Sequence, residues 1–528
     1  MIQNPILRGF NPDPSICRVG DDYYIATSTF EWFPGVQIHH SKDLKNWTVI
    51  AQPLNRLSQL DMKGVPDSCG VWAPCLTHHN GTFYLVYTNV KSFDGVWKDT
   101  PNFVVTTNDI KGDWSDPVYL NSSGFDGSFF HEGDKTWYTS MQIDHRQGKF
   151  FGGIELQEYS KEKMQLVGES YFISKGTELG YTEGPHIYRQ NGFYYLILAE
   201  GGTEYGHAAT ILRAKDITGP YEEHPENPVV SCRDYPNHYL QKAGHASMVE
   251  AADGSWYIVF LVGRPLTKHG RCVLGRETAI EEVIWKDHWP YINTVNALPR
   301  TQIPALYEGL HQNLLINKLY SFSEDKLDMD FQSLRIPKNE SWISLSERKG
   351  YLRLKGKESL TSTHSQSLVA RRLQHYDAII STAVEFEPEY FQQLAGLVVF
   401  YNTGHYHYLN ISGQGGKKLI SVISSDNFKM TEQIEKGEIS DTKKVYLRAE
   451  IKGADLQFYY SSDNDNFIKI GDLLDMSILS DDHVRDGSDR YRPAFTGCFV
   501  GICCQDLRSN KKHADFEWFK YVELPRKE

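Results

Sequence analysis

Residues 183–198 read EGPHIYRQNGFYYLIL, the clearest copy of a phrase that recurs along the chain. The phrase begins with a polar or small residue and continues through apolar residues, a turn dipeptide and a run of aromatics. Asn-Gly, Asp-Gly or Gly-Asp between two apolar runs is typical of a β-hairpin. Each copy therefore predicts one hairpin. The other copies are DPSICRVGDDYYIAT at 13–27, APCLTHHNGTFYLVYT at 73–88, DGSFFHEGDKTWYTS at 126–140 and HASMVEAADGSWYIVF at 245–260.

The copies keep a fixed register. They start 60, 53, 57 and 62 residues apart, and one more interval would begin near residue 305, where the phrase is lost. A repeat of this length, built of short strands and stopping after five copies, predicts a five-bladed β-propeller with four-stranded blades. We assign it to residues 1–300. The eleventh residue after each start is aromatic: Tyr24, Tyr84, Trp137, Tyr194 and Trp256.

One position of the repeat is expected to line the propeller axis. The first strand of each blade faces the central channel, so residues at one register of the repeats meet there. Three carboxylates at one axis are costly unless they are solvated, paired or used in chemistry. Acidic residues at this position could instead only cap turns. However, the position recurs in all five copies while its residue type changes, which favours a functional site over a repeated structural role. The predicted ring is Asp13, Ala73 with Trp72 beside it, Asp126, Glu183 and His245.

The predicted ring suits cleavage of a glycosidic bond. One carboxyl group can protonate the leaving oxygen while another activates water or attacks the sugar carbon. Phe30, Trp32 and Trp72 could offer apolar faces to a sugar, although such residues are as often core; we favour Trp72. His245 is at least as often a hydrogen-bonded channel histidine as a catalytic group. We expect no required cofactor, and no metal-ligand spacing supports a divalent cation such as calcium near His245.

The second half of the chain predicts a different β fold. Pro304 and Gly309 mark a linker over residues 301–318. Alternating apolar and polar residues then recur, for example at 351–355, 397–401, 446–450 and 456–460. Two packed antiparallel sheets would suit this pattern, so we assign a β-sandwich of the jelly-roll or concanavalin type to residues 319–528. The whole chain is expected to be all-β.

Composition narrows the function classes. The 528 residues include 55 basic and 67 acidic ones, a net charge of −12, without a basic cluster. Nucleic acid and anionic membranes are therefore poor partners. The chain shows neither an 18-residue apolar run nor a signal-peptide pattern, so we expect a cytoplasmic protein. Its eight cysteines form no C-x-x-C pair and are expected to be reduced.

Several motifs together resemble a known family. They are NPDPS at 11–15, WAP at 72–74, YTEGPH at 181–186, GHAS at 244–247 and LGRET at 274–278. The chain closely resembles glycoside hydrolase family 43, in particular its two-domain β-xylosidases. The resemblance implies a five-bladed propeller followed by a β-sandwich. It also implies exo-acting, inverting release of D-xylose from the non-reducing end of β-1,4-xylooligosaccharides, and relatives of this kind are often dimers or tetramers.

The resemblance assigns roles to individual residues. Asp13 matches the family's general base, Glu183 its general acid and Asp126 the third carboxylate, which orients the acid and tunes its pKa. We hypothesise that burial and Asp126 keep Glu183 protonated near neutral pH. The family usually places Ala where Gly127 stands, so the backbone beside Asp126 is expected to be looser. Arg276 matches a residue that binds substrate hydroxyls, Phe30, Trp72 and His245 match the pocket lining, and Phe495 would close the pocket from the sandwich.

Three other functions stay open from the residues. An α-L-arabinofuranosidase could use the same site, because the two terminal sugars present similar hydroxyls. A non-catalytic sugar-binding propeller would keep Trp72 and Phe30 but could dispense with the acids. An interaction scaffold would carry its acids on exposed blade rims rather than at one axial register.

Overall fold

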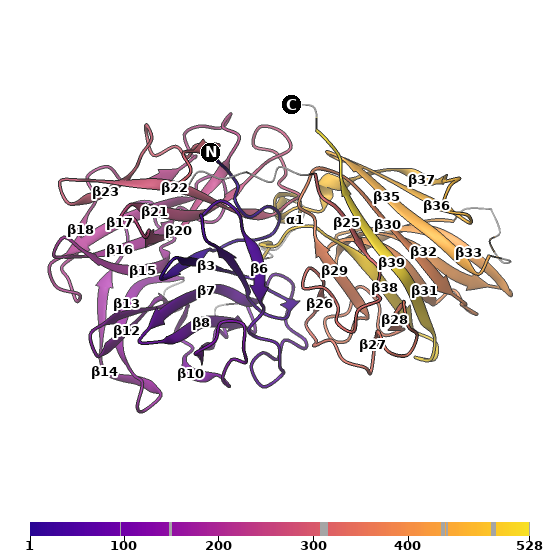
Figure 1. Cartoon of the computed structure of the whole chain (residues 1–528), viewed down its shortest axis with the longest axis horizontal. Helices are drawn as coiled ribbons and strands as arrows, with labels where there is room; N and C mark the ends of the chain where they lie inside the picture. Colours follow the sequence, from indigo (N-terminus) through magenta and orange to yellow (C-terminus); the bar gives the residue numbers. More distant parts are fainter. Residues whose placement is uncertain are drawn as a thin grey trace. The chain divides into compact units, whose positions relative to one another are not determined.

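The computed structural model of the chain describes residues 1–526 except 96, 147–149, 307–314, 435–438, 440–441 and 487–492. The chain divides into two compact units (Figure 1). The first unit comprises residues 1–269 and 276–312, and the second comprises 270–275 and 313–528. The expected borders were 1–300, 301–318 and 319–528. They place the segment 270–275 in the first domain, whereas in the structure it belongs to the second unit. Each unit is described by itself below.

The first unit is a five-bladed β-propeller, as the sequence predicts. Each blade is an antiparallel sheet whose strands follow one another in the chain. The blades are β2 (Ser15–Val19), β3 (Asp22–Thr27), β5 (Gln37–Ser41) and β6 (Thr48–Ala51); β7 (Gly70–His79), β8 (Thr82–Val90), β9 (Asn102–Thr107) and β10 (Val118–Asn121); β11 (Gly124–Glu132), β12 (Lys135–Ile143), β13 (Phe151–Ser160) and β14 (Gln165–Ser174); β15 (Glu183–Gln190), β16 (Phe193–Glu200), β17 (Ala208–Ala214) and β18 (Glu222–Glu223), with β19 (Val230–Ser231) also on β17; and β20 (Gln241–Glu250), β21 (Trp256–Gly263), β22 (Arg276–Lys286) and β23 (Trp289–Ile292).

The repeated phrase forms the first hairpin of every blade. In the second and fourth blades both turn residues have positive φ: 49° and 78° at Asn80 and Gly81, and 52° and 75° at Asn191 and Gly192. This conformation matches the right-handed twist of the flanking strands, which explains the Asn-Gly pairs. The apolar residues of the hairpins pack between neighbouring blades, where Tyr195 of the fourth blade joins one cluster with Phe260 of the fifth.

The two ends of the first unit meet. Strand β1 (Ile2–Gln3) pairs with β24 (Gln302–Ile303), and both Ile2 and Ile303 lie in a buried cluster with Tyr23. The predicted linker 301–318 therefore contains β24 and the start of β25 (Asn317–Tyr320), while its residues 307–314 lie outside the described part. A further short strand, β4 (Trp32–Phe33), lies between β3 and β5 in the chain.

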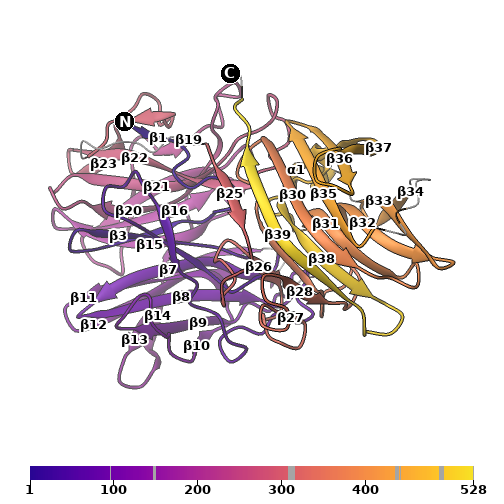
Figure 2. The same ribbon diagram turned by 45° about the vertical axis from the view of Figure 1, so that its right-hand side comes forward.

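The second unit is a β-sandwich, as predicted. Strand β35 (Lys444–Lys452) buries Val445, Leu447 and Ala449 while the residues between them face outward, the period of two expected of a half-buried strand. In Figure 2, β25 and β30 (Asp377–Phe386) run beside β39 (His513–Glu523), and both pair with it. One sheet has β27 (Ile343–Ser344), β28 (Leu352–Lys355), β39 (His513–Glu523), β30 (Asp377–Phe386), β35 (Lys444–Lys452), β36 (Asp455–Ser461) and β37 (Ile468–Asp475) in order, and the other β34 (Lys429–Ile434), β33 (Lys417–Asp426), β32 (His405–Gln414), β31 (Gln393–Asn402), β38 (Phe499–Asp506), β29 (Leu368–Arg372) and β26 (Gln332–Leu334).

Helix is scarce in the described part of the chain. The second unit carries the six-residue helix α1 (Asp481–Asp486) after a 3-10 turn, η2 (Met476–Ile478). Within the described residues, no helix has the length and apolar character needed to cross a membrane. All eight cysteines are free thiols, as expected, and all but Cys17 are buried.

Candidate active site

The backbone is unusual at the predicted ring positions. Asp13, Asp126 and His245 have φ values of 53°, 58° and 47°. This left-handed region is disfavoured for residues other than glycine, and strain of this kind gathers at functional sites. Three of the five blades therefore hold a ring side chain on a strained backbone.

The first strands of four blades also break their ladders at this register. A β-bulge inserts a residue and changes the direction in which a side chain points. Because these shifts coincide with the ring, they direct ring side chains away from the regular alternation of the strands. The pairing shifts between Trp72 and Cys75 in β7, Phe125 and Ser128 in β11, Glu183 and His186 in β15, and Gly244 and Ala246 in β20.

Asp13 is a buried, ionised carboxylate. Its side chain is 5 % exposed, Arg276 Nη1 donates to Oδ1 at 3.1 Å, and Ser28 Oγ donates to Oδ2 at 2.6 Å. His245 Nδ1 lies 3.8 Å from Oδ1. Burial by itself would raise the pKa of Asp13, but the charge of Arg276 and the Ser28 hydrogen bond help to outweigh burial, and the pKa is lowered. Asp13 is thus suited to accept a proton.

Asp126, Glu183 and His245 form the other side of the ring. One ligand-type atom of each lies within 4.8 Å of those of the other two. Asp126 and Glu183 are 6 % and 9 % exposed, and the Gly184 amide donates to Asp126 Oδ2 at 3.1 Å. The structure therefore brings together the carboxylates that the sequence placed at one register.

Glu183 has the opposite protonation from Asp13. Burial, followed by the charge of Asp13, raises the pKa of Glu183 to about 8, although Arg276 opposes the shift. Burial and the charges of Glu183 and Asp13 also raise the pKa of Asp126 well above its usual range. Carboxyl groups whose pKa values are driven apart in this way mark an acid and a base. Asp126 and Glu183 titrate as a pair, so the mutual repulsion expected between them acts together with burial and the charge of Asp13 to keep a proton on this side of the ring.

His245 packs against the backbone of the acid. A Cβ at Gly184 would lie 3.0 Å from His245 Cε1, and Gly184 has a φ of 58°, so both space and conformation require glycine. Burial lowers the pKa of His245, with Asp13 raising and Arg276 lowering it. The imidazole is therefore neutral.

The predicted aromatic residues lie together beside the carboxylates. The Phe30 and Trp72 rings are 6.0 Å apart between centroids, and the Arg276 guanidinium lies 5.5 Å from the Phe30 ring. Trp72 Nε1 donates to the Ser68 carbonyl at 3.0 Å, which fixes the indole. Trp32 is fully buried and belongs to the core.

The environment of Gly127 differs from the expected looseness. A Cβ at this position would lie 2.6 Å from Tyr138 Cε2 and 2.8 Å from its hydroxyl oxygen. The Tyr138 ring therefore fills the space of a side chain at residue 127. The glycine lets this ring pack beside Asp126.

Sequence reasoning missed several residues of the site. Ser28 and the histidines His186 and His207 are among them, and burial lowers the pKa of each histidine to about 3. Phe125, whose ring centroid lies 5.2 Å from that of Trp72, directly precedes Asp126 and could have been found from its position. Ser28 lies at the end of the first hairpin, where no motif marks it.

Glu200 is a further missed residue, and it holds the segment before the acid. Its fully buried carboxylate accepts from the Thr177 amide and hydroxyl, both at 2.8 Å, from Thr182 Oγ1 at 2.7 Å and from Thr210 Oγ1 at 2.6 Å. Thr182 directly precedes Glu183. Glu200 therefore anchors the start of β15, where the acid stands.

Two predictions about this site stay predictions. Phe495 lies in the second unit, is 8 % exposed and has the Arg485 guanidinium 5.1 Å from its ring. The spacing of Asp126, Glu183 and His245 would admit a cation, but a protonated Glu183 is a poor ligand.

Comparison with known proteins identifies the family. The model of glycosyl hydrolases family 43 matches residues 2–290. The chain belongs to glycosyl hydrolase family 43. Residues 320–522 match the β-xylosidase C-terminal concanavalin A-like domain, so both units have counterparts among family 43 enzymes.

Several relatives match over nearly the whole chain. The family 43 chain is 46 % identical to "Beta-xylosidase" of Bacillus subtilis (strain 168), covering 99 % of both chains. It is 47 % identical to "Xylosidase/arabinosidase 43B" of Humicola insolens, covering 98 % of this chain and 97 % of that one. The crystal structure of xylan β-1,4-xylosidase from Bacillus halodurans C-125 superposes with a TM-score of 0.95 at 48 % identity, covering 99 % and 100 % of the chains.

Proposed function

We propose that the chain is an exo-acting, inverting β-xylosidase that releases D-xylose from the non-reducing end of β-1,4-xylooligosaccharides. The observation that carries this is the opposite pKa shift of Asp13 and Glu183 within one ring of a family 43 propeller. An inverting glycosidase needs one ionised and one protonated carboxyl group at the same time. The relatives named as xylosidases support the choice of sugar.

In this proposal Glu183 is the general acid. It keeps its proton up to a pH of about 8 because burial and the charge of Asp13 disfavour its carboxylate. It donates that proton to the glycosidic oxygen as the bond to the anomeric carbon breaks, so the leaving sugar departs as an alcohol. Asp126, held by the Gly184 amide, orients the acid from the adjacent position.

Asp13 is the general base. Arg276 and Ser28 hold both of its oxygens and keep it ionised. It removes a proton from a water molecule, whose oxygen attacks the anomeric carbon from the face opposite the leaving group. This geometry needs the two carboxyl groups roughly 6.5–9.5 Å apart in the substrate complex, so that water fits between them.

The remaining residues bind the sugar. Arg276 has further guanidinium N–H groups beyond the one on Asp13, and these can donate to substrate hydroxyls. Phe30 and Trp72 offer apolar ring faces to the pyranose. Phe495 would close the sugar site, and the neutral His245 would contribute to its lining.

A second activity on α-L-arabinofuranosides is part of the proposal. The Humicola insolens relative, at 47 % identity, is named as both xylosidase and arabinosidase. Relative rates on an aryl xyloside and an aryl arabinofuranoside measure the share of each activity.

Oligomeric state and location are further parts of the proposal. We expect a dimer or tetramer, which light scattering measures. We also expect a cytoplasmic location, which cell fractionation measures.

The deciding experiment is proton NMR of xylobiose hydrolysis at early times. We expect α-xylose to appear before mutarotation mixes the anomers, because water attacks with inversion. Release of β-xylose first would indicate a covalent intermediate and overturn the role of Asp13. A folded protein that releases no xylose would point to an arabinofuranosidase or to a sugar-binding propeller.

A further inference from the structure

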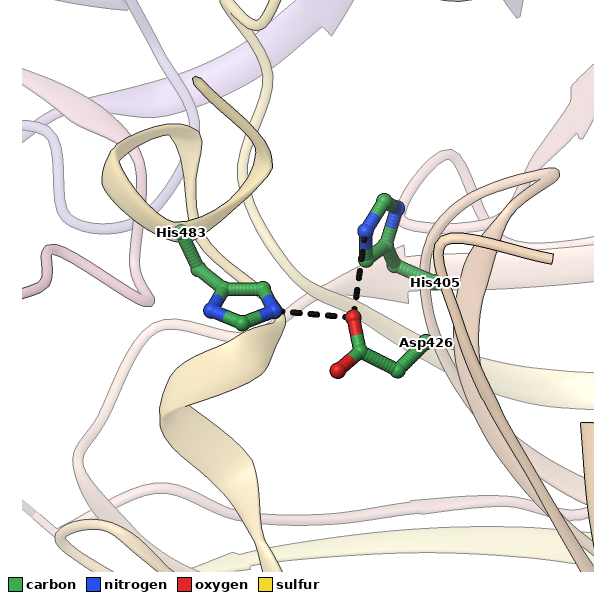
Figure 3. Close-up of side chains that lie close together, drawn as sticks. All are labelled: His405, Asp426 and His483. Carbon is green, nitrogen blue, oxygen red and sulfur yellow. Dashed lines mark hydrogen bonds and ion pairs between the residues drawn. The ribbon is translucent and has the colours of Figure 1, made fainter. Parts of the chain in front are cut away.

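The second unit holds a group of possible metal ligands outside the glycosidase site. His405, Asp426 and His483 each direct one ligand atom to a common point, with these atoms within 4.8 Å of one another (Figure 3). Asp426 Oδ1 lies 2.8 Å from His483 Nε2 and 3.5 Å from His405 Nε2. His405 begins β32, Asp426 ends the adjacent β33, and His483 comes from α1.

The tautomer of His405 is set by its neighbours. The Gly404 amide donates to Asn402 Oδ1 at 2.9 Å, so this atom is the amide oxygen. His405 Nδ1 lies 2.9 Å from the same oxygen and must carry a proton to bond it. Nε2 therefore carries a lone pair on the side of Asp426, and this lone pair accepts from the Asn427 amide at 3.2 Å. Metal-binding histidines are usually fixed in this manner through the other ring nitrogen.

His483 is presented by an anchored helix. The Tyr401 hydroxyl donates to Asp481 at 2.5 Å, and the Cys272 amide donates to Asp482 at 2.9 Å. The Nδ1 atom of His483 is buried without a hydrogen-bond partner in the described part of the chain. Its Nε2 faces Asp426, which is 48 % exposed, so the site is open to water on the aspartate side.

This donor set suits one class of ion. Two imidazole nitrogens and a carboxylate oxygen are preferred by Zn²⁺ and similar transition ions, whereas Ca²⁺ and Mg²⁺ prefer oxygen ligands alone. In a tetrahedral site with bonds of about 2.0–2.1 Å, ligand atoms lie roughly 3.3–3.5 Å apart. The His405–Asp426 separation already has this value, and the His483–Asp426 separation needs a small opening.

We propose that His405, Asp426 and His483 bind one divalent ion of the zinc class, with water as the fourth ligand. The ion takes the place of the proton on His483 Nε2, which moves to Nδ1 of the same ring, and of the Asn427 amide at His405. It links α1 to the β32–β33 hairpin within the second unit. The site is distinct from the carboxylates of the propeller.

Titration of the chelator-treated full chain with ZnCl₂, followed by calorimetry and by metal analysis after dialysis, tests the site. We expect His483→Gln and Asp426→Asn each to lose one bound equivalent. His364→Gln is the matched control, because His364 is an exposed histidine of the same unit, and it should bind as the unchanged chain does. Glu183→Gln should also keep this equivalent, which separates it from any ion at the propeller carboxylates.

A further variant tests the support of His405. Asn402→Ala should weaken zinc binding about 10- to 100-fold, because the imidazole loses the partner of Nδ1. Circular dichroism of every variant, and hydrolysis of an aryl xyloside by the variants of the second unit, verify the fold independently of the metal. The proposal is overturned if the unchanged chain binds no zinc, or if His483→Gln and Asp426→Asn both bind as much zinc as it does.

Discussion

The guanidinium of Arg276 makes the pKa values of the ring carboxyl groups differ. Arg276 donates to Asp13, and its charge lowers the pKa of Asp13 while opposing the rise at Glu183 and Asp126. The carboxylate that holds the arginine ionises first, and its own charge then keeps the proton on Glu183. The division between base and acid follows from this one contact.

The roles of Asp13 and Glu183 are separable with two substrates. Asp13→Ala and Glu183→Ala should each reduce turnover of xylobiose about 10²- to 10⁴-fold while the protein stays folded. An aryl xyloside whose leaving group has a low pKa needs no acid, so it should partly restore turnover by the Glu183 variant alone. Steady-state rates on the two substrates measure this, and equal losses on both would contradict the assignment.

The pH profile should report the same pair. Activity should fall as pH rises through about 8, where Glu183 loses its proton, and fall at low pH, where Asp13 gains one. In Arg276→Gln the pKa values of both groups rise, so both limbs of kcat/KM should move to higher pH. Arg213→Gln, which breaks an ion pair with the exposed Glu222, is the control. Unmoved limbs in Arg276→Gln would argue against this pairing.

At the scale of elements, the sequence repeat predicted both the strands of the propeller and the positions of the ring residues. The five hairpins and the ring register follow from local turn chemistry and from the geometry that blades share, so Asp13, Asp126 and Glu183 could be found. Ser28 and Glu200 could not, because each sits at the end of a strand and its role depends on a contact with another segment, Asp13 for Ser28 and Thr182 for Glu200. The β-bulges of the first strands could not be predicted either, because the alternation of apolar and polar residues does not reveal one inserted residue.

Glu200 should act as a positioning residue for the acid. Glu200 accepts four hydrogen bonds through its two oxygens. Glu200→Gln replaces one of these oxygens by an NH₂ group that cannot accept, so the segment that carries Thr177 and Thr182 should shift. We expect kcat on xylobiose to fall about 10- to 100-fold with little change in KM. The loss should shrink on an aryl xyloside of low leaving-group pKa, and Thr210→Val, away from the acid, should show a smaller loss. A uniform loss on both substrates would indicate general destabilisation.

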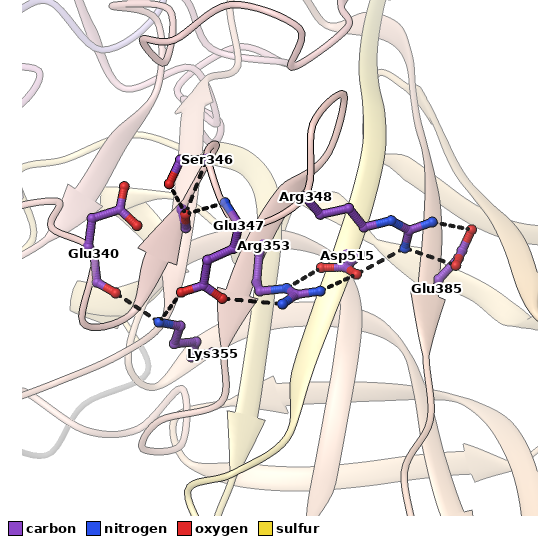
Figure 4. Close-up of polar contacts among 9 residues, drawn as sticks. Glu340, Ser346, Glu347, Arg348, Arg353, Lys355, Glu385 and Asp515 are labelled. Carbon is purple, nitrogen blue, oxygen red and sulfur yellow. Dashed lines mark hydrogen bonds and ion pairs between the residues drawn. The ribbon is translucent and has the colours of Figure 1, made fainter.

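An ion network ties three strands of the sandwich together (Figure 4). Asp515 on β39 accepts from Arg353 Nε at 2.7 Å and from Arg348 Nη1 at 2.9 Å, and Arg348 also donates to Glu385 on β30. Glu385 and Asp515 stand opposite each other in the sheet, so Arg348 separates two like charges. Lys355 and Arg353 on β28 share Glu347 at the other end.

This network should make the second unit sensitive to acid. Burial would raise the pKa values of Asp515 and Glu385, but their arginine partners lower both. A lowered pKa stabilises the fold above the ordinary value of about 4, and this stability is lost as pH falls through the lowered pKa. Asp515→Asn should cost about 2–4 kcal/mol at neutral pH, and this cost should shrink as pH falls below about 4. Urea unfolding at both pH values measures this; an equal cost at both would contradict it.

At the scale of the whole molecule, the sandwich was predictable as a class but not as a topology. Alternation in the sequence marks individual strands, yet β30 pairs with β39 more than a hundred residues later. No local pattern specifies such a partner, because the pairing is chosen by packing of the complete unit. The segment 270–275 was missed for the same reason: its partners lie far along the chain.

The segment 270–275 should make the propeller dependent on the second unit. The Val273 carbonyl accepts from the Cys498 amide at 3.0 Å, and Cys272 donates to Asp482. A chain ending at residue 306 loses these partners directly before Arg276, so we expect turnover to fall more than about 100-fold even where the blades fold. Phe495→Ala in the full chain is the control that removes only the predicted pocket residue. A truncated chain as active as that variant would show that the segment needs no anchor.

The same segment has a consequence for biosynthesis. At roughly 5–20 residues per second, a ribosome needs about 10–45 seconds to travel from residue 275 to Cys498. During that time Asp13, Asp126 and Glu183 have all been made, while the segment directly before Arg276 still lacks its partners Asp482 and Cys498. The nascent enzyme should therefore stay inactive until almost the last residues emerge, so that a chain broken off early yields no stray hydrolase.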